Sequence, residues 1–147
     1  MLALVFALVV GESATQSAAA LEPVVIQDAV FVSTIIPASG LFFRIIIRNN
    51  STDTDELVWV SMPVAAQIEV RTDGTLLARG QPVSLPIVIP AASGGKVGEV
   101  PLGVSVTGGK GKRNPANFRD WPGGIPVTLR FTRSGEITVI ARQVSPR

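Results

Sequence analysis

The candidate functional groups of this sequence are arginine and lysine side chains, because the residues that usually perform catalysis or bind metals are missing. The chain contains no histidine and no cysteine. That excludes Cys/His zinc sites, thiol nucleophiles, disulfides and histidine-based triads. A lysine or carboxylate mechanism needs a clustered pair, and no spacing here predicts one. We therefore expect a protein that is not an enzyme, with no cofactor and no small-molecule substrate.

Arg71 is the first candidate, because it lies at the shoulder of a predicted β-hairpin turn. Residues 67–79 read QIEVRTDGTLLAR, an alternating stretch followed by a Thr-Asp-Gly turn and a second apolar run. Two roles are open for this arginine. It either stabilises the hairpin shoulder, solvated or paired with Glu69 or Asp73, or it contacts an acidic partner.

A basic segment with interleaved aromatic residues is the second candidate. Residues 108–124 read GGKGKRNPANFRDWPGG, without the G-K-[ST] ending of a phosphate-binding loop. This segment is either a solvated loop or a docking surface for an acidic protein or anionic lipid headgroups. Nucleic acid is not expected as a partner. The partner-binding candidates here are Lys110, Lys112, Arg113, Phe118, Arg119 and Trp121.

Charge is unevenly distributed along the chain. Residues 1–70 carry 2 basic and 7 acidic groups, whereas residues 71–147 carry 11 basic and 4 acidic groups. Within the first part, NNSTDTDE at 49–56 lacks the glycine and the terminal glutamate of a calcium loop. We interpret it as a solvated acidic turn.

The N-terminus predicts export. Residues 1–10 read MLALVFALVV, and Ala18–Ala20 provide an A-x-A cleavage signal before Leu21. Ten helical residues reach about 15 Å, half of a roughly 30 Å hydrocarbon core. Residues 1–20 are thus either a signal peptide or a retained membrane anchor, and both place the domain at 21–147 outside the cytoplasm, in the periplasm and associated with the membrane. The anchor candidates are Leu2, Leu4, Val5, Phe6, Leu8 and Val9.

The elements that position these groups are predicted to be short strands. Segments rich in β-branched residues alternate with turn signals at about eight- to twelve-residue spacing, which is typical of a sandwich or barrel. Only Pro63 to Gln67 suggests a brief helical turn. In the last hairpin Val127, Leu129 and Phe131 share one face, and Ile137, Val139 and Ala141 can oppose them. The expected strands are 24–36, 40–49, 56–65, 66–72, 75–81, 83–89, 96–107, 125–132 and 136–144.

Several of these stretches together resemble the PCu(A)C-type periplasmic copper chaperones. They are DAVFV (28–32), RIIIRNNSTDTDELVWVSMPVAAQIEVR (44–71), VSLPIVIPAASGGKV (83–97) and GIPVTLRFTRSGEITVIARQV (124–144). The resemblance covers roughly residues 24–144. It implies a cupredoxin-like Greek-key β-sandwich and, in the family, one exposed Cu(I) site that delivers copper to membrane respiratory oxidases.

Carried over by position, the family's ligands are absent. The first histidine falls on Arg71, a methionine falls near Leu76 to Ala78, and the His-x-Met pair falls within Gly103 to Val106, near Val104 and Val106. Cu(I) prefers thioether, thiolate or imidazole donors, which arginine cannot replace. The remaining soft donor nearby is Met62, which we interpret mainly as a packing residue.

Two functions remain open. One is a non-catalytic exported accessory subunit that docks on a larger membrane protein complex of respiratory or photosynthetic type, on a scaffold without its metal site. The other is a periplasmic copper chaperone or metal-binding protein whose rearranged site uses Met62 and carboxylates.

Overall fold

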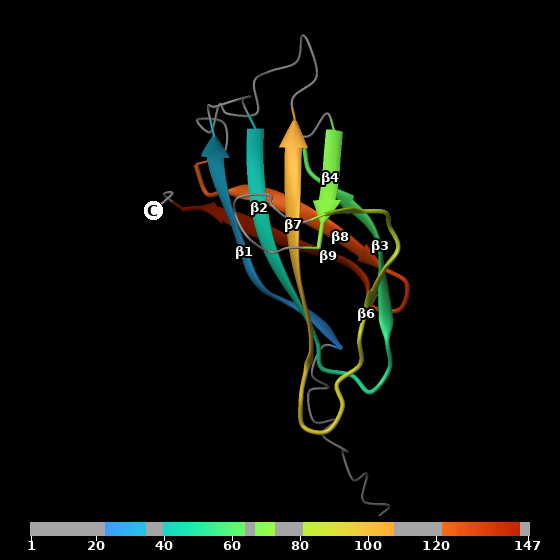
Figure 1. Cartoon of the computed structure of the whole chain (residues 1–147). Helices are drawn as coiled ribbons and strands as arrows, with labels where there is room; N and C mark the ends of the chain where they lie inside the picture. The colour runs from blue at the N-terminus through green and yellow to red at the C-terminus, as the bar shows by residue number, and fades with distance from the viewer. Residues whose placement is uncertain (1–22, 35–39, 64–66, 73–80, 108–121, 145–147) are drawn as a thin grey trace, which may run out of the picture.

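The computed structural model describes residues 23–34, 40–63, 67–72, 81–107 and 122–144, and these residues form β-strands joined by turns, with no helix among them. No segment of this described part is therefore a helix that could cross a membrane. The strands, labelled as in Figure 1, are β1 (Val24–Thr34), β2 (Gly40–Asn49), β3 (Asp55–Ser61), β4 (Gln67–Arg71), β5 (Pro82–Val83), β6 (Ile87–Ile89), β7 (Gly98–Thr107), β8 (Ile125–Phe131) and β9 (Gly135–Gln143).

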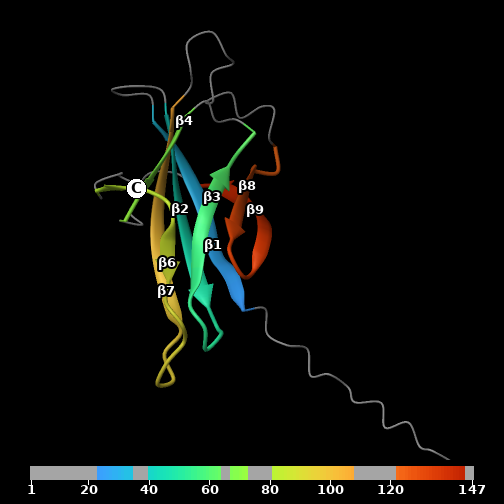
Figure 2. The same ribbon diagram turned by 90° about the vertical axis from the view of Figure 1, so that its right-hand side faces the viewer.

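The strands form two layers that share one continuous order, β5-β4-β7-β2-β1-β9-β8-β3-β6. Sheet A contains β5, β4, β7, β2 and β1, and sheet B contains β9, β8, β3 and β6. The parallel pairing of β1 with β9 joins them. Figure 1 looks onto sheet A with sheet B behind it, and Figure 2 shows the layers from the side. This is the expected cupredoxin-like Greek-key β-sandwich.

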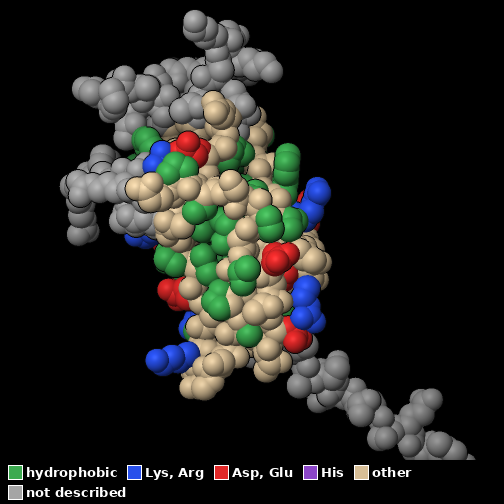
Figure 3. Space-filling view, turned by 45° about the vertical axis from the view of Figure 1, so that its right-hand side comes forward, with side chains coloured by type: hydrophobic (Ala, Val, Ile, Leu, Met, Phe, Trp, Pro, Cys, Tyr) green, Lys and Arg blue, Asp and Glu red, His purple; other side chains and the backbone are tan. Residues whose placement is uncertain are grey.

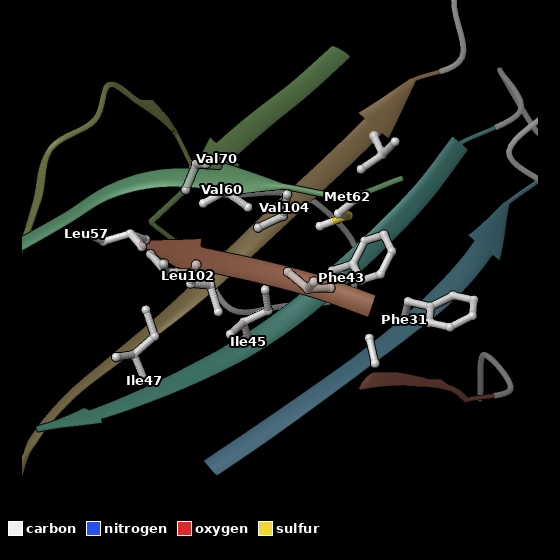
Figure 4. Packing of buried hydrophobic residues seen from close by; sticks show 14 of the residues in the cluster. Phe31, Phe43, Ile45, Ile47, Leu57, Val60, Met62, Val70, Leu102 and Val104 are labelled. Atoms are coloured by element: carbon white, nitrogen blue, oxygen red, sulfur yellow. The ribbon is translucent and has the colours of Figure 1, made fainter. Parts of the chain in front are cut away.

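Strict alternation explains which face of β2 is buried; this strand lies between β7 and β1 in sheet A. Leu41, Phe43, Ile45 and Ile47 are each 0% exposed, while the residues between them are half-buried on the other side. A strand with this period buries one face and solvates the other. Burial of each large side chain contributes roughly 1.5–3 kcal/mol. Figure 4 shows Phe43, Ile45 and Ile47 among side chains of β3, β4 and β7 between the layers.

The β8–β9 hairpin confirms the predicted facing of its side chains. Val127, Leu129 and Phe131 are buried, and Val127 pairs with Val139 and Leu129 with Ile137. The turn predicted around Gly135 is also present: this glycine has φ +74°, a conformation that side chains with a Cβ rarely adopt. The hairpin therefore follows from local sequence alone.

The predicted strand 83–89 is wrong as a single element. It is divided into β5, in sheet A, and β6, in sheet B, with a break at residues 84–86. Pro86 has no N–H to donate to a ladder, so pairing stops there. The predicted helical turn is not formed at Gln67, which begins β4, and most of the predicted strand 75–81 lies outside the described residues.

The interpretation of 49–56 as a solvated acidic turn is also wrong for Asp55, which is 4% exposed. Its carboxylate accepts hydrogen bonds from the backbone N–H groups of Glu56, Arg133 and Ser134 and from the Ser134 hydroxyl. Burial raises the pKa of Asp55, but these hydrogen bonds outweigh burial and bring the pKa below its ordinary value. Asp55 thus fastens the start of β3 to the β8–β9 turn.

Asn49 has a comparable structural role at the end of β2, where it is 0% exposed. Its amide nitrogen donates to the carbonyl of Asp53 at 2.8 Å, and its oxygen accepts from the backbone N–H and hydroxyl of Ser51, each at 2.9 Å. These hydrogen bonds hold the β2–β3 connection, and the Asn49 side chain is not exposed to solvent.

Candidate functional site

Arg71 ends β4 and lies on the outer face of sheet A. Its neighbour Val70 is 5% exposed and belongs to the core, so alternation directs Arg71 away from the core. The guanidinium pairs with the Glu69 carboxylate two residues earlier on the same face. This confirms the pairing predicted for Arg71 with Glu69; the other predicted partner, Asp73, lies outside the described residues.

Arg44 of β2 lies in the same cross-strand row as Arg71, on the outer face of sheet A. Arg71 pairs with Gly103 of β7, and Gly103 pairs on its other side with Arg44 of β2. Nη2 of Arg44 donates to the Asp28 carboxylate at 2.9 Å. Each arginine beside Gly103 therefore has a carboxylate of its own, and the row has no excess of positive charge to attract an anion.

Val104 and Val106 do not share this face. Each is 1% exposed, and Val104 pairs with Val70 and Val106 with Ile68 on the core side of sheet A. The β7 positions beside Arg71 and Glu69 on the outer face are Gly103 and Ser105. Since a shift of one residue moves a side chain to the opposite face, the structure does not bring Val104 or Val106 together with Arg71.

Met62 follows β3 and belongs to the core. It is 7% exposed and is one of the residues of the buried cluster, where Figure 4 shows its side chain among the hydrophobic residues between the layers. A flexible thioether fills irregular space in such cores. Its packing role is the one the structure shows. In the described part of the chain, no group of at least three histidine, cysteine, aspartate or glutamate residues is placed to hold a metal ion.

The remaining predicted site residues lie outside the described parts of the chain. These are the ligand positions Leu76 and Ala78, the basic-segment residues Lys110, Lys112, Arg113, Phe118, Arg119 and Trp121, and the anchor residues Leu2, Leu4, Val5, Phe6, Leu8 and Val9. The structure does fix where the basic segment attaches: it follows the end of β7 and precedes β8.

The sequence did not predict an exposed tryptophan, Trp59, on the outer face of sheet B. The strand ELVWVS reads as an uninterrupted alternation with Leu57 and Trp59 on one face. In the structure the β3–β8 register shifts between these two residues, so Leu57 is 0% exposed while Trp59 is 53% exposed. A bulge of this kind redirects a side chain to the opposite face. No residue type in β3 predicts this bulge.

With this geometry in place, comparison with known proteins identifies the fold. No family model and no curated protein sequence matches the chain. Among solved structures, the apo PCuAC domain from PmoF1 superposes with a TM-score of 0.59 at 17% identity, over 84% of this chain and 95% of that one. The chain has a PCuAC-type fold.

Two further PCuAC structures agree. The copper-bound PCuAC domain from PmoF2 gives a TM-score of 0.58 at 16% identity and covers 84% of this chain and 94% of its own. The apo form of that PmoF2 domain gives 0.55 at 19% identity, with 84% and 91% covered. At these identities the PCuAC likeness establishes the architecture, and function must be argued from the residues on it.

Proposed function

We propose that the protein is a non-catalytic, exported accessory subunit that docks on a larger membrane protein complex and uses a PCuAC-type sandwich without a copper site. The observation that carries this proposal is the outer row of sheet A. There Arg71, Gly103 and Arg44 lie side by side, each arginine is paired with a carboxylate, and Ser105 is the next residue of β7 on this face. None of these side chains is a soft donor.

Copper chemistry supports this conclusion. Cu(I) is held by thioether, thiolate or imidazole groups, and arginine remains protonated and cannot coordinate it. The PmoF2 PCuAC domain has been solved with copper bound. The present chain would instead have to use Met62, which is packed in the core. An accessory role therefore fits the described residues better than a copper-carrying role.

The N-terminal sequence and the basic segment supply the rest of the proposal. The apolar residues 1–10 direct the chain out of the cytoplasm, and the segment 108–121 between β7 and β8 offers four cations with two aromatic residues to an acidic surface of the complex. A respiratory or photosynthetic assembly is the kind of partner we propose, with anionic lipid headgroups as a secondary contact.

Co-extraction from native membranes tests the proposal. We expect the untagged protein to remain bound to a membrane complex after mild detergent extraction and to be released as salt is raised, because screening weakens contacts between charges. Its migration as an isolated protein at low salt would contradict the proposal.

A charge variant then tests the contribution of the basic segment. Lys110→Gln, Lys112→Gln, Arg113→Gln and Arg119→Gln together should weaken association and its salt dependence without unfolding the sandwich. Lys96→Gln is the control, because it removes an exposed cation before β7 begins, at the other end of that strand. Unchanged association of the quadruple variant would remove the segment from the proposal.

A further inference from the structure

We draw no further inference here: the strongest candidate, the apolar edge of the sandwich near β4 and β6 (Figure 3), where residues 82–90 are uncharged and Val88 is 58% exposed, carries none because nothing in the part of the chain that the structure describes shows what covers it.

Discussion

The charged and apolar groups on the two outer faces of the sandwich are arranged differently. On sheet A, Arg44 and Arg71 each pair with a carboxylate nearby, at Asp28 and Glu69, on either side of a glycine. On sheet B, the Arg130–Glu136 contact is long and exposed, and Trp59 stands open to solvent beside it. The face that carries the position of the family's first histidine, by resemblance, is the one on which Arg44 and Arg71 are both ion-paired.

The core of this sandwich does not determine which groups its two outer faces carry. The core between the sheets depends on alternating β-branched and aromatic residues and places no demand on which outward side chains are present. An arginine at the end of β4 and a tryptophan beside a register shift in β3 change what the molecule can bind without changing the sandwich. Both faces can therefore be tested by substitutions that preserve the fold.

The largest expected effect on stability comes from placing a histidine on the core side of β7 instead of its outer side. Val104→His should lower the free energy of unfolding by about 3 kcal/mol, because it places a larger, polar ring in a packed core. Ser105→His, one residue later on the outer face, should cost less than about 1 kcal/mol. Urea unfolding of both variants measures the difference. Equal costs would show that the register of β7 described above is wrong.

Removal of the Asp55 carboxylate is expected to have the next largest effect on stability. Asp55→Ala removes the acceptor for the N–H groups of Arg133 and Ser134 and should cost about 2–3 kcal/mol in free energy of unfolding. Asp53→Ala is the control, because its ion pair with Arg133 is exposed on both sides. Similar losses for the two variants would contradict the fastening role of Asp55.

The same carboxylate predicts a pH dependence. Since the folded-state pKa of Asp55 is lowered, its stabilising contribution is present above the ordinary carboxyl range near pH 4 and is lost as the pH falls through the folded-state pKa. The difference in unfolding free energy between the unsubstituted protein and Asp55→Asn should therefore be constant near neutrality and shrink in acid. A difference that grows as the pH falls would contradict a lowered pKa of Asp55 in the folded state.

The smallest effects compare the ion pairs of the two faces. Arg71→Ala and Arg130→Ala should each change stability by no more than about 1 kcal/mol, because exposed pairs contribute little. Double-mutant cycles with Glu69→Ala and Glu136→Ala should give a larger coupling for Arg71–Glu69, whose arginine is 23% exposed, than for Arg130–Glu136, where both side chains are 56% exposed. A stronger coupling on sheet B would reverse the comparison of the faces.

Much of the fold follows from sequence because it is encoded locally. The alternation of β2 and of the β8–β9 hairpin, the turn glycine Gly135 and the pairing of Arg71 with Glu69 depend on residues close together in the chain. The resemblance stated from sequence also led to the correct fold.

The features that the sequence did not reveal depend on long-range contacts. Asp55 is buried by a turn about eighty residues away, between β8 and β9. Trp59 faces outward because of a register shift against β8. That shift is not encoded by residues within β3 alone, which is why the facing of Trp59 required the structure.

We propose that this PCuAC-type sandwich has no copper site, and competition for Cu(I) against a chelator of known affinity tests the proposal most directly. We expect the protein to take no Cu(I) from the chelator at submicromolar free metal. The outer row of sheet A offers arginine, glycine and serine, and Met62 is packed in the core, so no soft donor is available there. Submicromolar Cu(I) binding that disappears in Met62→Ala would contradict the account and establish a metal-binding role.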